Sequence, residues 1–212
     1  MSSRSVVGAD ARFIVLEGID GCGKTSVALR LQDALSVVLP RRPFYTREPS
    51  DEVIRRMLLH EDDHRARLLL FMLDRVSHAR RIRQALDDGH WVLCDRYLHS
   101  TLVYNPVPVL DGLLGDDGFY RLVRWFSGDL YPDLVLWLDC DVELALSRIR
   151  ERGLREPMDD IGLLSEARRR YSELQGRLPG IVRVDASGSL DEVVSICLET
   201  IYERFGSGDG VQ

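Results

Sequence analysis

The sequence predicts an α/β fold in which helices cover both faces of a five-stranded parallel sheet. Three observations predict this class. Five short apolar runs recur along the chain, stretches with helical periodicity separate them, and a glycine-rich turn follows the first run. Short apolar runs are typical of strands buried on both faces of a parallel sheet, and helices between parallel strands cover those faces. A length of 212 residues fits a single domain over residues 1–212.

The five apolar runs give the predicted strands, at residues 13–16, 43–46, 91–94, 134–138 and 181–184. The predicted helices are the stretches whose apolar residues recur at helical spacing. They cover residues 24–37, 52–60, 66–87, 97–104, 116–127, 141–151, 161–176 and 189–204. In the helix at 66–87, we expect core contacts from Leu68, Leu69, Met72 and Val76. Polar or glycine-rich composition predicts flexible ends at 1–11 and 206–212.

Composition argues against several classes of protein. A net charge of −6 leaves no basic excess to neutralise a nucleic-acid backbone. The N-terminus lacks the apolar stretch of a signal peptide, and no run approaches the ~18 apolar residues of a membrane span. The four cysteines, Cys22, Cys94, Cys140 and Cys197, form no CxxC pair. We therefore expect a cytoplasmic protein with reduced core thiols and with neither nucleic acid nor membrane as a partner.

The only lysine of the chain lies in a phosphate-binding loop pattern. Lys24 belongs to Gly18-Ile-Asp-Gly-Cys-Gly-Lys-Thr25, which reads Gly, four residues, Gly, Lys, Thr. An apolar run precedes the loop and an amphipathic helix follows it, so backbone N–H groups and a helix N-terminus can bind phosphates there. The sequence therefore predicts a P-loop NTPase fold that binds ATP. The predicted contacts are Gly18, Asp20, Gly21, Cys22, Gly23, Lys24, Thr25 and Ser26.

A charged pair follows the third predicted strand. Asp95 closes the apolar run, and Arg96 comes next. A carboxylate beside a phosphate loop can hold Mg²⁺, and the neighbouring guanidinium can bind a phosphate through two hydrogen bonds. The alternative is structural: Asp95 caps the next helix and Arg96 only pairs with Asp95.

Two further sets of residues carry weaker signals. Phe71 and Arg75 share a helix face, where a ring and a guanidinium could bind a flat heterocycle; the alternative is one core and one surface residue. Four arginines gather around Gly153: Arg148, Arg150, Arg152 and Arg155. The segment 150–160 could be a lid over ATP or a solvated helix end.

With these residues in view, the chain resembles the thymidylate kinases, a family of P-loop nucleoside-monophosphate kinases. The resemblance runs from about Phe13 to Glu203. It rests on five segments in order, at 13–25, 46–49, 69–75, 95–104 and 131–139. The loop alone is unspecific, whereas the five segments in this order are diagnostic of the family.

The resemblance implies ATP-dependent, Mg²⁺-assisted phosphorylation of dTMP to dTDP by a homodimer. Lys24 and Thr25 would bind the ATP phosphates, and Thr25 with Asp95 would hold Mg²⁺. No general base is needed, because the second pKa of an acceptor phosphate is about 6. Family members with glycine at the place of Gly21 carry a catalytic arginine in the lid. The implied catalytic groups are Lys24, Asp95, Arg96 and a lid arginine from Arg150, Arg152 and Arg155.

On the acceptor side, the resemblance implies a clamp on the dTMP phosphate by Arg47 and Arg96. Phe71 would stack on the thymine and Arg75 would donate to its O4, while Tyr104 would crowd the 2′ position of the sugar. Asp20 would lie near the 3′-hydroxyl and Glu48 near the phosphate. The implied substrate-binding set is Asp20, Arg47, Glu48, Phe71, Arg75, Arg96, Thr101, Tyr104 and Asn105.

The chain departs from the family pattern at three places. Ser50-Asp51 replaces a longer Gly-Gly-Thr segment after Arg47-Glu-Pro49. Asn105 stands where a glutamine commonly faces the base, and the residues at 106–109 replace a glycine-rich loop. The lid segment lacks the usual Asp-Arg-x-Glu run.

Three alternative functions stay open at this point. The chain could phosphorylate a monophosphate of another base. It could phosphorylate a deoxynucleoside, for which Glu17 lies close enough to the loop to act as the base. It could also be a regulatory nucleotide-binding module that turns over ATP without an acceptor. His99, the histidine nearest these motifs, has no assigned role.

Overall fold

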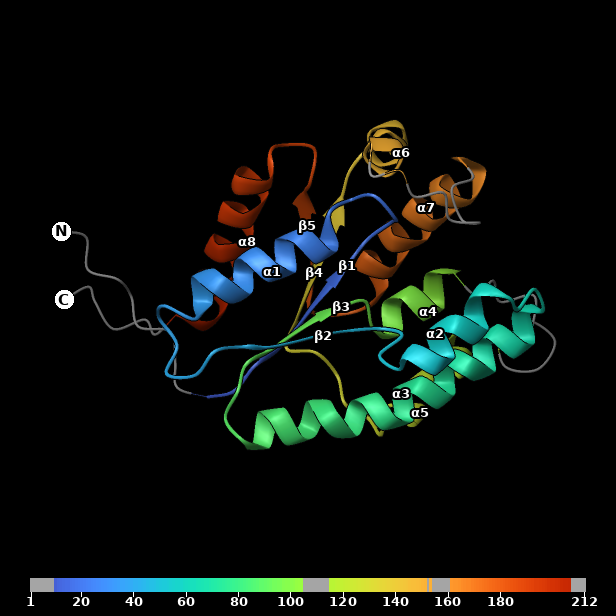
Figure 1. The fold of residues 1–212 in the computed structure, drawn as a ribbon, viewed down its shortest axis with the longest axis horizontal. Helices are drawn as coiled ribbons and strands as arrows, with labels where there is room; N and C mark the ends of the chain where they lie inside the picture. The colour runs from blue at the N-terminus through green and yellow to red at the C-terminus, as the bar shows by residue number, and fades with distance from the viewer. Residues whose placement is uncertain (1–9, 105–114, 152, 154–160, 207–212) are drawn as a thin grey trace.

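The computed structural model describes residues 10–104, 115–151, 153 and 161–206. They form one sheet of five parallel strands in the order β2-β3-β1-β4-β5 (Figure 1). The strands are β1 (Phe13–Glu17), β2 (Phe44–Arg47), β3 (Val92–Asp95), β4 (Leu134–Asp139) and β5 (Ile181–Asp185). The predicted five-stranded parallel α/β fold is confirmed.

The described helices follow the predicted order, with ends that differ by up to two residues. They are α1 (Lys24–Leu35), α2 (Glu52–Leu59), α3 (His64–Asp87), α4 (Leu98–Tyr104), α5 (Gly115–Phe126), α6 (Val142–Glu151), α7 (Ile161–Arg177) and α8 (Leu190–Phe205). The starts of α2, α3 and α8 are fixed by side chains that accept from the first backbone N–H groups: Asp51, Asp63 and Ser189.

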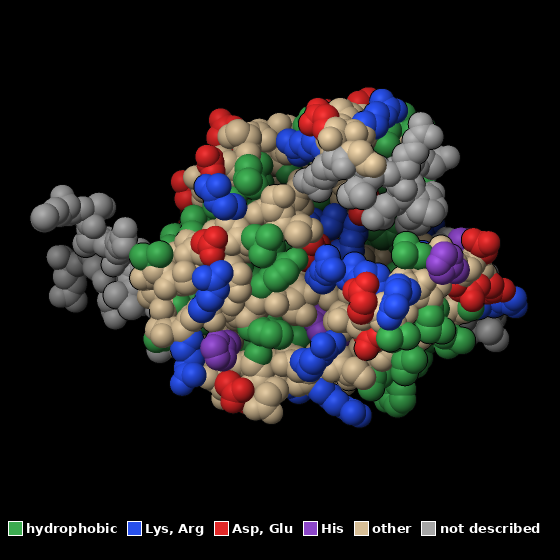
Figure 2. Space-filling model, viewed as in Figure 1, with side chains coloured by type: hydrophobic (Ala, Val, Ile, Leu, Met, Phe, Trp, Pro, Cys, Tyr) green, Lys and Arg blue, Asp and Glu red, His purple; other side chains and the backbone are tan. Residues whose placement is uncertain are grey.

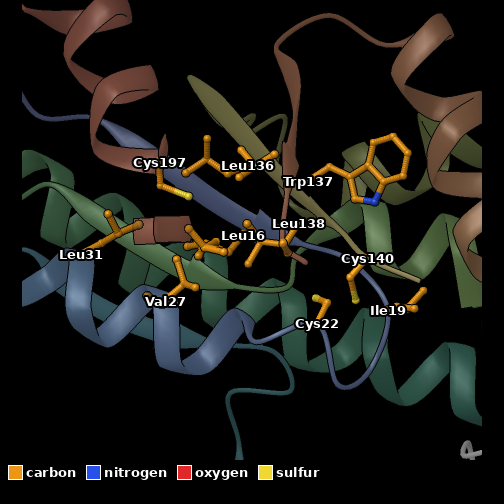
Figure 3. Packing of buried hydrophobic residues seen from close by; sticks show 14 of the residues in the cluster. Leu16, Ile19, Cys22, Val27, Leu31, Leu136, Trp137, Leu138, Cys140 and Cys197 are labelled. Carbon is orange, nitrogen blue, oxygen red and sulfur yellow. The ribbon is translucent and has the colours of Figure 1, made fainter. Parts of the chain in front are cut away.

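Helices cover both faces of the sheet, with α1 and α8 on one side and α3 and α5 on the other (Figure 1). Successive residues of β1 point to opposite faces. Leu16 packs with Val27 of α1 and Cys197 of α8 (Figure 3). Val15 belongs to a second buried apolar cluster, on the opposite face of the strand, together with Met72 of α3. Both faces of the central strand are therefore buried, which explains its continuous apolar sequence.

All five strands extend one residue beyond their predicted ends. Each ends on a charged residue: Glu17, Arg47, Asp95, Asp139 and Asp185. Ladder pairing continues through these positions, as in the pairing of Arg47 with Asp95. The charged side chains therefore lie at the carboxyl edge of the sheet, where ligands of open α/β sheets bind.

One predicted core contact in α3 is wrong. Leu69 is 66% exposed and Leu73, one turn later, is 61% exposed, whereas Leu68 and Met72 are buried. The apolar pattern of α3 thus contains two stripes, and only one of them faces the sheet.

Cys22, Cys94, Cys140 and Cys197 are all buried and unpaired. Among the helices that the structure describes, none has the length and apolar character needed to cross a membrane.

Candidate active site

The phosphate-binding loop joins β1 to α1, and glycine is required at two of its positions. Gly18 has a φ of 143°, and a Cβ there would lie 2.4 Å from the carbonyl oxygen of Leu138 in β4. Gly21 has a φ of 82°, and a Cβ there would lie 2.2 Å from the carbonyl oxygen of Ala145 in α6. Side chains are therefore excluded by both conformation and space. The loop is packed tightly against β4 and α6.

Lys24 begins α1 and folds back over the loop. Its buried Nζ donates to the carbonyl oxygen of Ile19 at 2.8 Å and lies 3.7 Å from Sγ of Cys22. Gly23 precedes the helix in the left-handed conformation, with no side chain to cap the first N–H groups. Ser26 lies in the same first turn. An ammonium beside uncapped N–H groups forms a site that suits phosphate.

The two predicted metal ligands lie together. Oγ1 of Thr25 donates to Oδ2 of Asp95 at 2.5 Å. The contact forms because β3, which Asp95 ends, pairs with β1, which leads into the loop. Mg²⁺ prefers hydroxyl, carboxylate and phosphate oxygens, so these two side chains fit that ion.

Arg96 connects the loop to α4. Its Nη1 donates to the carbonyl oxygen of Gly18 at 3.1 Å and to Oγ of Ser100 at 3.0 Å. Its Nη2 donates to Oδ1 of Asp20 at 2.5 Å, and the guanidinium lies 5.2 Å from the ring centre of Tyr104. Its φ is 71°, a conformation uncommon for a residue with a side chain. The alternative that Arg96 only pairs with its neighbour Asp95 is therefore wrong.

The charges around the loop favour an anionic ligand. Burial opposes the ionisation of Asp20, but the nearby charges of Arg96 and Lys24 outweigh burial and lower the pKa of Asp20. Asp20 is thus stabilised as a carboxylate by two cations, while Asp95 places a second carboxylate at the loop. Arg96 and Lys24 can both bind the oxygens of a phosphate group here.

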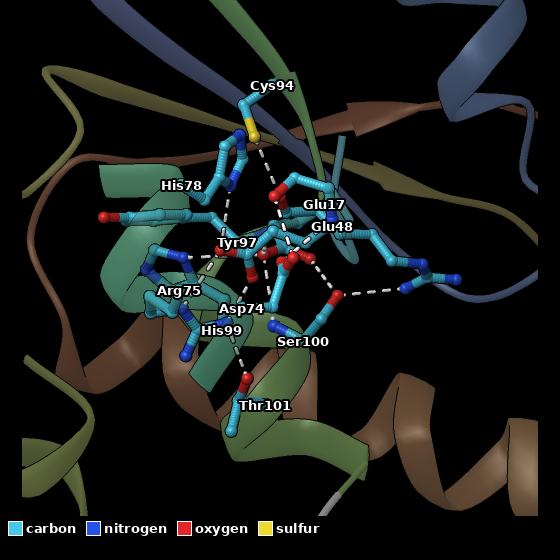
Figure 4. A network of polar contacts seen from close by, with 12 residues as sticks. Glu17, Glu48, Asp74, Arg75, His78, Cys94, Tyr97, His99, Ser100 and Thr101 are labelled. Carbon is cyan, nitrogen blue, oxygen red and sulfur yellow. Dashed lines mark hydrogen bonds and ion pairs between the residues drawn. The ribbon is translucent and has the colours of Figure 1, made fainter. Parts of the chain in front are cut away.

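Glu17, the alternative general base, is fully engaged in hydrogen bonds (Figure 4). Its Oε1 accepts from the backbone N–H groups of Tyr97 (2.9 Å) and Ser100 (3.1 Å). Its Oε2 accepts from the hydroxyls of Ser100 (2.5 Å) and Tyr171 (2.8 Å). Glu17, rather than Asp95, thus caps the start of α4. Burial raises the pKa of Glu17, although these hydrogen bonds and the charge of Arg96 oppose the increase.

Arg75 of α3 is fully buried in a second polar cluster, also shown in Figure 4. Its Nε and Nη2 donate to the two carboxylate oxygens of Glu48, and Nη2 donates to Oγ1 of Thr101 at 2.8 Å. Its Nη1 is buried and has no hydrogen-bond partner among the residues that the structure describes. Burial opposes the ionisation of Glu48, but the charge of Arg75 and hydrogen bonds from His78 and Arg75 lower the pKa of Glu48. The alternative of a surface residue at position 75 is wrong.

Phe71 lies one turn before Arg75. It is half-buried and packs against the apolar cluster that contains Val15 and Met72. The ring and the guanidinium therefore share one face of α3, as the four-residue spacing requires. The unpartnered Nη1 of Arg75 can donate to a ligand carbonyl beside this ring.

Arg47 ends β2 next to Asp95 in the sheet, and its side chain is exposed. Arg55 of α2 is an additional cation that sequence reasoning missed. Burial and the like charge of Arg47 lower the pKa of Arg55, although the charge of Glu52, whose Oε2 lies 3.6 Å from Nε of Arg55, opposes the decrease. Within the described part of the chain, this Nε is buried and has no hydrogen-bond partner. Figure 2 shows Lys and Arg side chains gathered near the centre of this face. Two guanidinium groups that repel each other here indicate a site for an anion.

The shortened segment at Ser50-Asp51 is held by α3. Asp74 accepts from the backbone N–H and hydroxyl of Ser50 and from the backbone N–H of Asp51, each at 2.8 Å. Asp51 in turn caps α2. Three hydrogen bonds to one carboxylate therefore fix the loop without the longer glycine segment.

A groove of about 470 Å³ beside the loop was also missed by sequence reasoning. It is lined by Cys22, Gly23 and Ser26 of the loop region, and by Arg148 and Ala186 among others. Arg148 donates from Nη1 to the carbonyl oxygen of Ala186 at 2.9 Å, which joins α6 to the segment after β5. The groove is continuous with the phosphate loop, so a flat group attached to a bound triphosphate can enter it.

Some predicted residues are less informative in the structure. Arg150 lies exposed near the end of α6. Arg152, Arg155 and Asn105 lie outside the described residues, as does most of the predicted lid. Burial and the charge of Arg75 lower the pKa of His99 to about 3, so this histidine is neutral at pH 7.

Among the described residues, one group of acidic and histidine side chains is close enough to hold a metal: Glu48, Asp74 and His78 have ligand atoms within 4.8 Å of one another. Their atoms already have partners: Glu48 binds Arg75, and Asp74 binds Ser50. The group is therefore a structural network around Arg75 rather than a metal site.

Comparison with known proteins agrees with this arrangement. The family model described as "Thymidylate kinase" matches residues 16–196. A thymidylate kinase of Magnetococcus marinus is 34% identical over 209 residues, covering 92% of this chain and 97% of the relative. One from Synechococcus sp. is 38% identical over 191 residues, covering 83% and 88%. One from Coprothermobacter proteolyticus is 34% identical over 197 residues, covering 89% and 98%.

Proposed function

Because the chain belongs to the thymidylate kinase family, we propose that it transfers the γ-phosphoryl group of ATP to dTMP, giving ADP and dTDP. The observation that carries this proposal is the placement of Arg96. Its guanidinium is bound to the P-loop through Gly18 and Asp20 and to α4 through Ser100. An arginine fixed between these elements serves an acceptor that already carries a phosphate.

On the donor side, Lys24 and the first turn of α1 bind the ATP phosphates. Cys22, Gly23 and Ser26 line the groove beside Arg148. This groove receives the adenine. Thr25 and Asp95 would hold Mg²⁺, which when bound would neutralise charge on the ATP phosphates.

On the acceptor side, Arg47 and Arg96 bind the dTMP phosphate, with Arg55 adding positive charge. Asp20 orients Arg96 and lies near the sugar. Tyr104, whose ring lies under Arg96, limits the space at the 2′ position. These groups hold the acceptor phosphate in line with the donor, which is most of what phosphoryl transfer requires.

The thymine site is formed by Phe71 and Arg75, with Thr101 alongside. Glu48 neutralises Arg75, so the free Nη1 offers a hydrogen bond without excess charge. That combination suits the neutral O4 carbonyl of thymine. Asn105 completes the proposed set.

A catalytic arginine must come from outside the phosphate loop. Gly21 lies against Ala145 of α6 and leaves no room for a side chain. We therefore assign this role to one of Arg150, Arg152 and Arg155, in the lid proposed for residues 150–160. The charge of that arginine would be applied to the transferred phosphoryl group.

A nucleoside acceptor is disfavoured by one specific observation. Both carboxylate oxygens of Glu17 already accept two hydrogen bonds, and the side chain is fully buried. Glu17 therefore cannot reach a 5′-hydroxyl as a general base.

We also propose a homodimer in the cytoplasm. Leu69 and Leu73 of α3 and Trp125 of α5 expose large apolar side chains on neighbouring helices, and Figure 2 shows hydrophobic side chains over this region at the lower right. Exposed apolar surface of this kind suits burial against a second copy. Sedimentation equilibrium would measure the association directly. The net charge of −6 supports the absence of a nucleic-acid partner.

The activity test is ADP release from ATP·Mg²⁺ with six acceptor conditions: dTMP, dUMP, dCMP, dGMP, thymidine and no acceptor. Strong stimulation by dTMP alone is the expected result. Stimulation by another monophosphate would keep the phosphate site and correct the base assignment. Preference for thymidine, or turnover that no acceptor changes, would contradict the proposed function.

A further inference from the structure

Glu17, Ser100 and Tyr171 form a buried polar network beside Arg96 that the proposed reaction does not use directly. The three residues come from the end of β1, from α4 and from α7. Glu17, Ser100 and Tyr171 are all buried, and the hydroxyls of Ser100 and Tyr171 both donate to Glu17. Buried polar groups with complete partners restrict the geometry of what they contact.

Ser100 is the link between this network and the site. Its hydroxyl donates to Oε2 of Glu17 at 2.5 Å and accepts from Nη1 of Arg96 at 3.0 Å. Since a serine hydroxyl has one hydrogen, its bond to Glu17 leaves its lone pairs for Arg96. The carboxylate thereby fixes Ser100 as an acceptor for the guanidinium.

Tyr171 fixes the other side of the same carboxylate. Its hydroxyl donates to Oε2 of Glu17 at 2.8 Å and lies 3.0 Å from the hydroxyl of Ser100. Its ring stacks on Trp137 with the ring centres 6.1 Å apart, so the position of the hydroxyl is set by packing as well. Tyr171 therefore holds Glu17 and Ser100 in the arrangement that Arg96 needs.

Arg96 needs external support because its own backbone does not favour its position. Its φ of 71° lies in the left-handed region. Nη1 donates to Gly18 and Ser100, and Nη2 donates to Asp20. These bonds determine which N–H groups of Arg96 remain to bind a phosphate. Small errors in such an orientation reduce phosphoryl transfer strongly.

We propose that Tyr171 and Ser100, acting through Glu17, are positioning residues that orient Arg96 for the acceptor phosphate. This inference rests on the proposed kinase activity. It adds that α7, which follows the segment at 150–160 in the chain, is coupled to the acceptor side by the Tyr171 hydroxyl. None of the three residues contacts the reacting atoms.

The test is a double-mutant cycle between Tyr171→Phe and Arg96→Lys. Tyr171→Phe keeps the ring and removes one hydroxyl, so we expect kcat to fall about tenfold, as for loss of a hydrogen bond in a charged network. The KM for ATP should stay within about twofold, since Lys24 and α1 are untouched. In the Arg96→Lys background, Tyr171→Phe should lower kcat less than about twofold, because the group it positions is gone.

A merely structural role gives a different pattern. Equal fold-losses in both backgrounds would overturn the proposal, as would an unchanged kcat for Tyr171→Phe. Tyr131→Phe is the matched control: its hydroxyl donates to the carbonyl oxygen of Pro179 at 3.3 Å, away from Arg96. That variant should keep the wild-type kcat.

Ser100→Ala keeps the proposal testable if Tyr171→Phe folds poorly. It removes the acceptor of Arg96 directly, so its loss of kcat should equal or exceed that of Tyr171→Phe and should also vanish in the Arg96→Lys background. A wild-type kcat in Ser100→Ala would contradict the proposal. If the wild-type protein transferred no phosphoryl group to any monophosphate, the proposed function itself would be rejected. If it used a monophosphate other than dTMP, the double-mutant cycle would be measured with that acceptor.

Discussion

Two arginines of the candidate site, Arg96 and Arg75, are both bound to a carboxylate, yet their surroundings differ. The Arg96 side chain keeps 17% exposure, and its partner Asp20 is shared with Lys24. Arg75 has no exposure, and Glu48 is bound to its Nε and Nη2. The first setting leaves positive charge for a phosphate. The second cancels the charge and leaves one N–H group for a neutral ligand, so the same side chain serves two kinds of recognition.

The two buried glutamates show the complementary contrast. Glu17 and Glu48 are both fully or nearly buried, but burial raises the pKa of Glu17, whereas the charge of Arg75 overcomes burial and lowers the pKa of Glu48. Glu17 is held mainly by hydroxyl and backbone donors, and Glu48 by a guanidinium in direct contact. A carboxylate in a protein interior is therefore stabilised as an ion chiefly when a full opposite charge touches it.

The largest expected effect comes from removing the exposed arginine of the pair. Arg96→Ala should lower kcat for dTMP phosphorylation by about 10³, the scale of arginine contributions to phosphoryl transfer. A coupled ADP-release assay with saturating ATP measures it. Arg80→Ala, which removes an exposed arginine of α3, should leave kcat unchanged. A loss below about tenfold for Arg96→Ala would remove the distinction drawn between the two arginines.

The next effect is on stability. Glu48→Gln leaves the buried Arg75 without its counter-charge, so the free energy of unfolding at pH 7 should fall by about 3–5 kcal/mol. Urea unfolding measures this change, with the exposed Glu143→Gln in α6 as the matched control. Because the pKa of Glu48 is lowered from 4.5 in the folded state, its stabilisation is present above pH 4.5 and is lost as the pH falls further. The difference from wild type should therefore shrink in acid.

Glu17→Gln should show the opposite pH dependence. The pKa of Glu17 is raised from 4.5 in the folded state, so its ionisation reduces wild-type stability as the pH rises above that value. Glutamine does not titrate, and any stability advantage of wild type over Glu17→Gln should shrink toward neutral pH. Parallel pH profiles for the two variants would contradict the contrast between the glutamates.

The sheet and the P-loop could be predicted because their signals lie in consecutive residues. Each strand extends one residue beyond its apolar run, because charged residues such as Glu17 and Asp95 break the apolar pattern while the ladder continues. In α3 the sequence predicts a core contact for Leu69, whereas its side chain is exposed, because spacing alone does not tell which apolar stripe of a helix meets the sheet.

The polar networks could not be predicted from one sequence. The contact of Tyr171 with Glu17 joins residues 154 positions apart, and that of Arg75 with Glu48 joins residues 27 apart on different elements. Neither has a local spacing rule. Only the pairing of strands and the packing of α3 and α7 bring these groups together, so a sequence signal could name Glu17 and Arg75 but not their partners.

The smallest expected effect concerns the buried arginine. Arg75→Lys keeps a cation beside Glu48 but loses the planar fork and the free Nη1, so the KM for dTMP should rise about tenfold while the KM for ATP stays unchanged. Steady-state kinetics with each substrate varied in turn separates the two values. Arg83→Lys, at a residue of α3 that donates to the carbonyl oxygen of Ser127, should change neither. A rise in the KM for ATP alone would place Arg75 on the donor side and would end the assignment of this pocket to the thymine.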